Sequence, residues 1–274
     1  KKHKTSVTAA TISKWINQYK SICTFARIRK QAIKLYTPKN IINKQTLNHI
    51  QPYTFKCHKA KLDILLKENP NFAALKDYIE KINTKDFPHH IFTYYQENPK
   101  NSRASNVNFN YLDLKISKKE NLSIKLAKLA LNLATTNKER HQKIQDFMLI
   151  NDGATIATEI PTYLTNWDAA YYRSKKGFVF PLNNYQTPIT GHIDILQIKN
   201  GLLHILDYKP NADKINPVEQ LTIYAMALSK KLNLPLSDFK CAWFDENNYY
   251  EFFPLHAVYE KQNTMKKENR QKIA

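Results

Sequence analysis

Two apolar runs joined by a two-residue turn constrain the fold of this chain more than any other feature of its 274 residues. The runs are ITGHIDILQI at 189–198 and LLHILDYK at 202–209, and Asn200-Gly201 lies between them. An Asn-Gly pair in this position is a strong signal for a β-hairpin, because both residues accept the positive φ angles of a tight turn. We therefore predict two adjacent antiparallel strands that are apolar enough to be buried on both faces.

The segments around this hairpin predict an α/β domain. A helix ends at the Asn-Asp-Gly sequence 151–153, and a later helix has Pro217 in its first turn, where proline is well tolerated. The expected elements are helix 138–150, strands 154–164, 189–198 and 202–209, helix 217–231, and strands 238–244 and 249–253. Up to position 244 their order is α-β-β-β-α-β.

The first half of the chain differs, because all four glycines lie at position 153 or beyond. We expect this half to consist of helices joined by turns rich in Asn, Pro and Lys. Its predicted helices are 8–19, 22–35, 44–50, 56–67, 72–82 and 122–136. The stretch 98–110 is the most loop-like of the chain and is expected to be a hinge. The predicted domains are a basic helical nucleic-acid-binding region (1–133), an α/β domain (134–260) and a basic tail (261–274).

Charge is distributed very unevenly along the chain. Residues 1–150 contain 28 Lys and Arg but 10 Asp and Glu, a net charge of +18, whereas residues 151–250 have a net charge of −1. Residues 1–50 contain no acidic residue at all, and aromatic residues are interspersed among their lysines. This pattern is typical of a polyanion-binding surface, so we predict contact with nucleic acid. The alternative is a codon bias towards Lys, Asn and Ile, which by itself does not explain the near-neutral second half.

Cysteine content and hydropathy exclude several classes of protein. Three cysteines without a C-x-x-C pair disfavour a disulfide framework, a cysteine-rich zinc site and a four-cysteine iron–sulfur cluster. No run of 18 apolar residues occurs, so no membrane span is expected. The start, KKHKTSVTAA, has no apolar run after its lysines and is not a secretory signal. The default prediction is an intracellular protein of the cytoplasm, nucleoid or nucleus.

Polar residues inside the two apolar runs define a candidate site. Asp194 lies within the first run, where a buried carboxylate is costly unless it is paired or bound to a metal. Asp207 and Lys209 are two residues apart at the end of the second run, so their side chains project to the same side. Two carboxylates and a lysine on adjacent strands suit Mg²⁺ or Mn²⁺, with the lysine beside the attacking water. The alternative for Asp207 and Lys209 is a surface ion pair.

Three short motifs point to a known family. G-x-x-D at Gly191–Asp194, D-x-K at Asp207–Lys209 and Q-x-x-x-Y at Gln220–Tyr224 occur in this order on a strand, a strand and a helix. Together they resemble the RecB-like branch of the PD-(D/E)XK nuclease superfamily. The resemblance covers about residues 137–245 and implies a restriction-endonuclease-like αβββαβ core, the order predicted above.

The resemblance implies roles for the residues at the ends of the two central strands. Asp194 and Asp207 would bind the metal and take part in catalysis. The backbone carbonyl of Tyr208 would be a further ligand, and Lys209 would be the catalytic lysine.

The resemblance also implies contributions from the flanking elements. Gln220 and Tyr224, one helical turn apart, would line the site and touch the DNA backbone. Glu159 would be a ligand through water or would orient the catalytic lysine. The family uses a His or Glu of the first helix as a ligand, and Glu139 and His141 are the candidates. At about 100° per residue, His141 faces the sheet and Glu139 faces solvent, so we favour His141 and a preference for Mn²⁺. The alternative for each is a structural role.

The amino-terminal residues 6–16 (SVTAATISKWI) resemble the second helix of a transposase-type helix-turn-helix, in which T-I/V-x-x-W-I/V follows a turn of small residues. The early residues of such a helix face the major groove, and Trp15 would pack inward. An ordinary capped amphipathic helix is the alternative. The residues expected to contact DNA in this region are Lys14, Lys20, Arg27, Arg29 and Lys30.

These features predict a metal-dependent nuclease that hydrolyses DNA phosphodiester bonds, in mobile-element recombination or DNA repair. Mg²⁺ or Mn²⁺ is the expected cofactor, and duplex or single-stranded DNA is the expected partner. Two alternatives stay open: a catalytically silent DNA-binding protein with a nuclease-like fold, and a nuclease that cleaves RNA. Endonuclease and exonuclease action are both compatible with the sequence.

Overall fold

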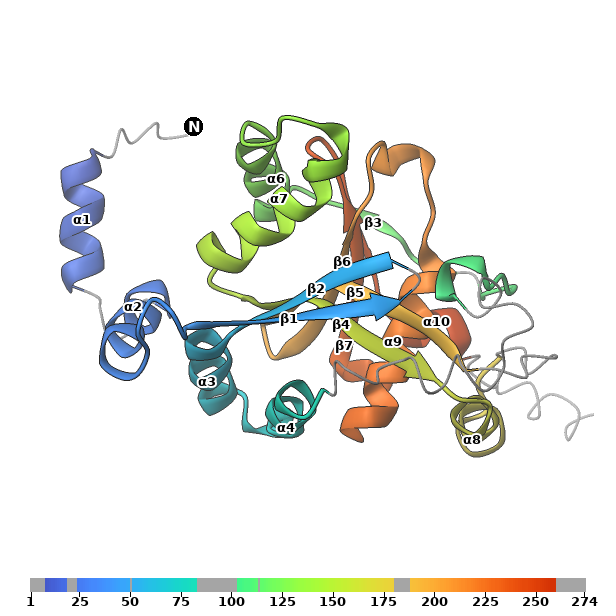
Figure 1. The fold of residues 1–274 in the computed structure, drawn as a ribbon. Coiled ribbons are helices and arrows are strands. Elements are labelled where there is room, and N and C mark those ends of the chain that lie inside the picture. The colour runs from blue at the N-terminus through green and yellow to red at the C-terminus, as the bar shows by residue number, and fades with distance from the viewer. Residues whose placement is uncertain are drawn as a thin grey trace, which may run out of the picture.

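The computed structural model describes residues 8–18, 24–49, 51–82, 103–112, 114–179 and 188–259. Within these residues, one eight-stranded sheet has the order β1-β2-β4-β5-β6-β7-β8-β3 (Figure 1). The strands are β1 Ile42–His49, β2 Gln51–His58, β3 Ser117–Lys118, β4 Thr155–Leu164, β5 Ile189–Lys199, β6 Leu202–Tyr208, β7 Phe239–Phe244 and β8 Tyr249–Phe252. Neighbouring strands are antiparallel except β6 and β7, which are parallel.

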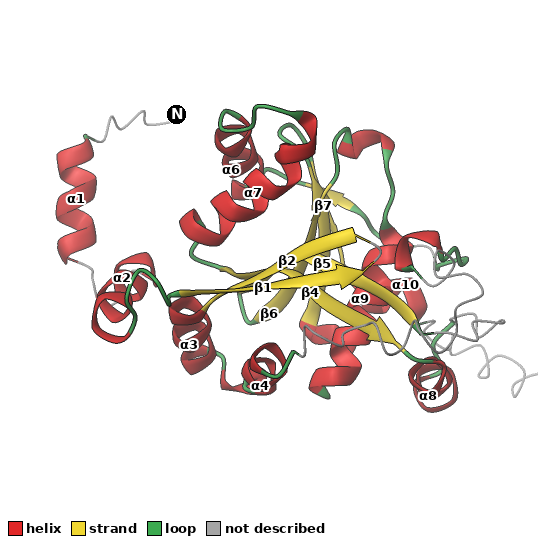
Figure 2. Cartoon of the chain, in the orientation of Figure 1, coloured by secondary structure: helices red, strands yellow, loops and turns green. Residues whose placement is uncertain are grey.

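Helices cover both faces of this sheet, as Figure 2 shows. The described α-helices are α1 Ala9–Gln18, α2 Thr24–Leu35, α3 Lys59–Glu68, α4 Ala74–Glu80, α6 Leu122–Leu131, α7 Asn137–Asn151, α8 Asn166–Lys176, α9 Val218–Leu232 and α10 Pro254–Val258, of which α1 does not cover the sheet. A larger core lies between the sheet and α3, α4, α9 and α10. A smaller core lies between the other face and helices α6 and α7. Among the described helices, none combines the length and the apolar character that crossing a membrane requires.

The predicted α-β-β-β-α-β succession is present as α7, β4, β5, β6, α9 and β7. Helix α9 makes the crossover that the parallel pair β6–β7 requires. Helix α8, which is inserted between β4 and β5, was not predicted. Its ends carry ordinary signals: Thr165 and Asp168 form a capping box, and Gly177 ends the helix with a φ of 65°. The chain is therefore a mixed α/β protein with its longest strands at the centre of the sheet.

The expectation of helices throughout the first half is wrong between residues 42 and 58. Strands β1 and β2 replace the predicted helix 44–50 and the start of the predicted helix 56–67, so α3 begins only at Lys59. The period-two pattern of β2 explains the difference, because Tyr53, Phe55 and Cys57 all contact the larger core. Strand β2 pairs with β4, so the predicted regions 1–133 and 134–260 both contribute strands to one sheet.

The loop-like stretch 98–110 is anchored where the structure describes it. Residues Ala104–Asn106 form one 3₁₀ turn, and Ala104, Val107 and Phe109 are buried in the larger core. This anchoring contradicts the predicted hinge at 103–109, because apolar burial fixes the position of the segment. Residues 98–102 lie outside the described part of the chain.

The predicted helices 8–19 and 22–35 are confirmed as α1 and α2. Trp15, which was expected to pack inward, is 49% exposed, because α1 lies apart from the sheet (Figure 1). Lys14 and Lys30 are exposed on these helices, as contact with DNA would require. Arg27 and Arg29 lie in α2, and Lys20 lies outside the described residues.

Helix α7 is tied to α3 by a buried lysine. Lys61 is 1% exposed, and its Nζ donates hydrogen bonds to the carbonyl oxygens of Leu149 (2.5 Å) and Asp152 (2.6 Å). The last carbonyl groups of a helix have no partner within the helix and carry the negative end of its dipole. The Lys61 ammonium group donates to carbonyl groups at this helix end, and its positive charge balances the negative end of the dipole. Lys61 therefore fixes the carboxyl end of α7 against α3.

Replacement of Lys61 by Met is expected to lower the free energy of unfolding by about 2 kcal/mol, because buried carbonyl groups would lose their donor. Chemical denaturation followed by circular dichroism measures this change. Lys67→Met, on the exposed side of the same helix, is the matched control and should change stability by less than about 0.5 kcal/mol. Equal effects of the two substitutions would contradict the role assigned to Lys61.

Candidate metal centre

The centre lies where strands β5 and β6 stop pairing. Their pair furthest from the hairpin turn is Ile195↔Leu206. The next residues on the two strands are Asp194 and Asp207, which therefore face one another where the strands separate. The backbone N–H of Tyr208 donates a hydrogen bond to Oδ2 of Asp194 at 3.3 Å. The end of strand pairing thus brings two carboxylates together, as the sequence analysis predicted.

The backbone of β4 is strained beside this point. Glu159 has a φ of 54°, a left-handed conformation that is uncommon for any residue except glycine. The pairs Thr158↔Ile195 and Ile160↔Ile193 lie on either side of Glu159 and Asp194 in the register of β4 and β5. Regular alternation along β5 would place Ile193 and Ile195 on one face, but Ile193 packs in the larger core and Ile195 in the smaller one. Strict alternation therefore fails at Asp194, where the distorted ladder lets β5 change faces.

Three side chains converge as a candidate set of metal ligands. His141, Asp194 and Asp207 each offer a ligand atom, and these atoms all lie within 4.8 Å of one another. Nε2 of His141 is 2.5 Å from Oδ2 of Asp194. Asp207 is 3% exposed, and its Oδ1 has no hydrogen-bond donor in the described part of the chain. A buried carboxylate oxygen without a donor is costly, and a divalent cation would satisfy it.

The two neighbouring carboxylates have strongly different pKa values. Burial, followed by the charge of Asp194, raises the pKa of Asp207 well above its usual range. Burial also acts to raise the pKa of Asp194, but the charge and hydrogen bond of His141 outweigh it and hold that pKa below its usual range. The charge of Asp194 in turn raises the pKa of His141 to about 9, against the effect of burial. The two neighbouring acids therefore ionise together only where cationic groups balance their charge.

Lys209 provides part of this balance. Its Nζ lies 2.8 Å from Oδ2 of Asp207, so the predicted D-x-K pair is an ion pair. The Asp207 side chain is only 4% exposed, so the pair is not a surface ion pair. Burial acts to lower the pKa of Lys209, but the charge of Asp207 outweighs it and raises the pKa. The side chain is therefore an ammonium group and a hydrogen-bond donor at neutral pH.

Glu159 lies on β4, the strand that pairs with the Asp194-bearing strand β5. Its Oε1 accepts a hydrogen bond from Gln145 Nε2 at 2.6 Å, and Nδ1 of His192 lies 3.9 Å from its Oε2. Burial raises the pKa of Glu159 to about 7. Its partners among the described residues are therefore on α7 and β5, and none of these contacts links it to Lys209, the residue it was expected to orient.

The predicted pair on α9 lines a cleft beside the cluster. Nε2 of Gln220 donates to the Tyr224 hydroxyl at 2.9 Å. Both residues, with His141 and Asp194, line a cleft of about 220 Å³. A Cβ at Gly191 would lie 2.4 Å from Cε1 and 2.6 Å from the hydroxyl of Tyr224. The glycine of the G-x-x-D motif is therefore required because the tyrosine ring occupies the space of a side chain.

The cleft also has a wall formed by residues that were not predicted to belong to the site. Tyr53 of β2 lines it together with Arg103 and Ser105. The Tyr53 ring packs at 4.0 Å from the ring of His192, and Nη2 of Arg103 donates to the Tyr53 hydroxyl at 3.3 Å. The period-two pattern of β2 was a signal for Tyr53. No local signal marked the other two residues, because only tertiary packing brings them to the cleft.

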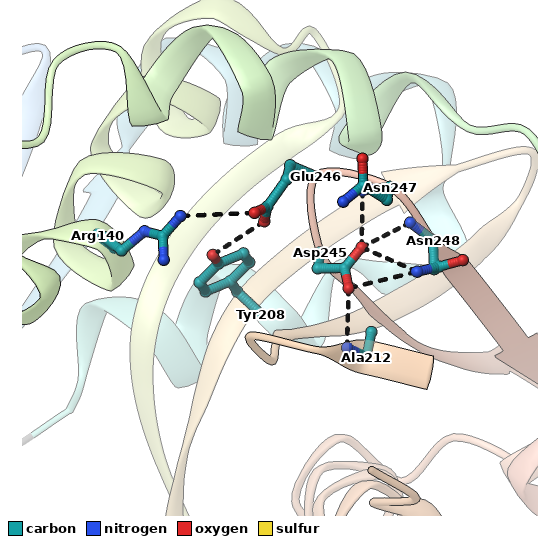
Figure 3. Close-up of polar contacts among 7 residues, drawn as sticks. All are labelled: Arg140, Tyr208, Ala212, Asp245, Glu246, Asn247 and Asn248. Atoms are coloured by element: carbon teal, nitrogen blue, oxygen red, sulfur yellow. Dashed lines mark hydrogen bonds and ion pairs between the residues drawn. The ribbon is translucent and has the colours of Figure 1, made fainter. Parts of the chain in front are cut away.

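A polar network supports the end of β6 (Figure 3). The hydroxyl of Tyr208 donates to Oε2 of Glu246 at 3.3 Å, and Nη2 of Arg140 donates to Oε1 of Glu246 at 3.5 Å. Asp245 accepts hydrogen bonds from the backbone N–H groups of Ala212, Asn247 and Asn248. Arg140 immediately precedes His141, so the turn after β7 connects the two elements that carry candidate ligands.

The structure separates the two candidate ligands on α7. Oε2 of Glu139 accepts hydrogen bonds from the backbone N–H (3.2 Å) and the hydroxyl (2.9 Å) of Thr135, at the amino end of the helix. His141 lies in the cluster with Asp194 and Asp207. The helical geometry deduced from the sequence therefore agrees with the placement of both side chains.

Replacement of Gly191 by Ala is expected to lower the free energy of unfolding by about 1–3 kcal/mol, since the methyl group would collide with the Tyr224 ring. Gly153→Ala is the control, because a Cβ there meets no atom within 4 Å. Tyr224→Leu removes the ring, so the double variant should lose less stability than the sum of the single losses. Strictly additive losses in urea denaturation would show that the ring does not lie against Gly191.

A second prediction concerns metal affinity. Substitution His141→Ala should weaken Mn²⁺ binding by at least about tenfold, the loss typical even for residues that merely support a metal ligand. Glu139→Ala should leave the affinity unchanged. Isothermal titration calorimetry of the metal-free protein with Mn²⁺ compares the two variants with the wild type. A larger loss for Glu139→Ala would reverse the assignment.

No family model, no curated protein and no solved structure matches the chain. The interpretation of the centre rests on its own geometry.

Proposed function

We propose that this protein is a metal-dependent nuclease that hydrolyses phosphodiester bonds of DNA. The convergence of His141, Asp194 and Asp207, with Lys209 beside them, is the observation that carries the proposal. A cluster of carboxylates around an unpaired buried oxygen is costly for folding, whereas metal-assisted hydrolysis requires such a donor set. The order α7, β4, β5, β6, α9, β7 supports the proposal, because it is the core order of the PD-(D/E)XK nucleases that the motifs resemble.

The donor set fits a hard or borderline divalent cation. His141, Asp194 and Asp207 would hold Mg²⁺ or Mn²⁺, with the carbonyl oxygen of Tyr208 as a further ligand. The bound cation would polarise the scissile phosphate and favour ionisation of the attacking water. The imidazole favours Mn²⁺ over Mg²⁺.

The protein's own side chains would do the remaining work. The Lys209 ammonium group, held by Asp207, would donate a hydrogen bond to the negative charge that develops on phosphate oxygens as the P–O bond breaks. Glu159 lines the same cleft, where its carboxylate can accept a hydrogen bond from a water molecule. Gln220 and Tyr224 would contact the backbone of the bound strand.

Nucleic acid is the substrate that the charge distribution favours. The first 150 residues have a net charge of +18, and such a surface gains affinity by releasing counterions from phosphates. A catalytically silent DNA-binding protein has no use for a carboxylate cluster beside its phosphate partner. The presence of Asp194, Asp207 and Lys209 in one cluster therefore favours catalysis over binding alone.

Purified protein is expected to cleave DNA with Mn²⁺ or Mg²⁺ and to stop cleaving when the metal is removed by a chelator. Lys209→Met should lower the rate by about 10²–10³-fold, the loss typical when one charge-stabilising donor is removed. Asp207→Asn should abolish cleavage but retain DNA binding. Asp213→Asn, on an exposed turn after β6, is the matched control and should cut like the wild type.

Gel assays on linear duplex, circular and single-stranded DNA, with RNA in parallel, measure these rates and identify the preferred substrate. Cleavage without metal, or equal rates for Asp207→Asn and Asp213→Asn, would contradict the proposal. Binding without any cleavage by the wild type would favour the silent DNA-binding alternative.

A further inference from the structure

The cleft at the metal centre is completed by residues from outside the α7–β7 succession. Tyr53 of β2 lines it, as do Arg103 and Ser105 of the segment that precedes α6. These residues share the cleft with His141 and Asp194, which lie at least 36 residues further along the chain. A polynucleotide strand bound near the centre would therefore contact the α7–β7 succession and also residues that precede it in the chain.

Arg103 is held firmly at this position. Its backbone forms a parallel β-bridge with Thr190, the residue before the glycine of the G-x-x-D motif. The next residue, Ala104, is 1% exposed, and Val107 is 2% exposed in the larger core. A side chain on an anchored segment needs little ordering when a ligand binds, so Arg103 is preorganised for contact.

Aromatic and polar contacts connect the Arg103 side chain to the cluster. Its Nη2 donates to the hydroxyl of Tyr53 at 3.3 Å, and the Tyr53 ring lies 4.0 Å from the ring of His192. Nδ1 of His192 lies 3.9 Å from Oε2 of Glu159, which lies between the same two pairs of the β4–β5 register as Asp194. The guanidinium group thus lies at the cleft wall and is linked to the cluster through two rings.

The charge and size of the cleft indicate what this group binds. Glu159 and Asp194 line the cleft, so an approaching phosphodiester needs a cation to offset their repulsion. A guanidinium group suits this role, because its planar N–H groups match two phosphate oxygens at once. The cleft volume of about 220 Å³ is smaller than the roughly 300–1,000 Å³ of pockets that enclose a drug-sized ligand. It accommodates a backbone phosphate rather than a base pair.

We propose that Arg103 binds a backbone phosphate of the substrate next to the scissile one, and that Tyr53 positions its guanidinium group. The substrate is then a single polynucleotide strand that passes between β2 and the Gln220–Tyr224 pair of α9. This inference rests on the proposed function, since it concerns the same cleft. Phosphate contacts carry no base information, so Arg103 contributes affinity for strands of any sequence.

Binding is tested in the full chain carrying Asp207→Asn, which prevents cleavage, with fluorescently labelled 12-nucleotide DNA strands of two unrelated sequences. Arg103→Gln should weaken binding of both by about tenfold or more, the loss expected for a hydrogen bond to a charged group. It should also reduce the slope of log K against log[salt] by about 0.7, the value for one phosphate of a single strand. Tyr53→Phe should give a smaller loss.

Arg173→Gln is the matched control, because it removes the same charge from an exposed position on α8. It should change the affinity less than twofold. In the active protein with Mn²⁺, Arg103→Gln should raise KM more than it lowers kcat. Arg103→Lys should restore only part of the affinity, since an ammonium group is a point charge and lacks the planar donor fork.

Equal affinities and equal salt slopes for Arg103→Gln and Arg173→Gln would overturn this inference. So would a lower free energy of unfolding for Arg103→Gln with an unchanged salt slope, which would assign Arg103 a purely structural role. Failure of the proposed function has a different signature, namely the absence of metal-dependent cleavage by the wild type.

Discussion

The proximity of Asp194 and Asp207 is the main physical constraint on the centre of this sheet. Two largely buried carboxylates repel one another and lose hydration, so they persist only where cationic groups and rigid backbone hold them. His141 lies on one of them and Lys209 on the other. His141 belongs to α7, whose carboxyl end is capped by the buried ammonium group of Lys61.

Strand pairing and packing around the cluster serve the same end. The ladder between β5 and β6 stops at Ile195↔Leu206, and the left-handed backbone of Glu159 interrupts the neighbouring ladder at the same level. Such strain costs about 1–3 kcal/mol and persists only where the surroundings enforce it. Within β5 itself, the absence of a side chain at Gly191 leaves room for the ring of Tyr224. The cleft thus results from two local departures from regular sheet geometry.

Particular elements show how much of this was predictable. The hairpin of β5 and β6 follows from its Asn-Gly turn, and the assignment of His141 over Glu139 follows from the 100° helical rotation, because both signals lie within a few residues. The predicted helix at 44–50 failed because a short, mostly polar segment resembles an amphipathic helix until its pairing partner is known. Helix α8 was missed although its capping box and final glycine mark both ends.

The order of helices and strands, the motif residues and the uneven charge follow from the amino-acid sequence, because backbone preference and periodicity are encoded by near neighbours. The second wall of the cleft does not. Tyr53 and Arg103 reach the cluster only because β2 pairs with β4 and the segment 103–109 is buried against the larger core. These contacts join residues from 50 to more than 100 positions apart, and the free energy gained by burying apolar surface decides which of them form.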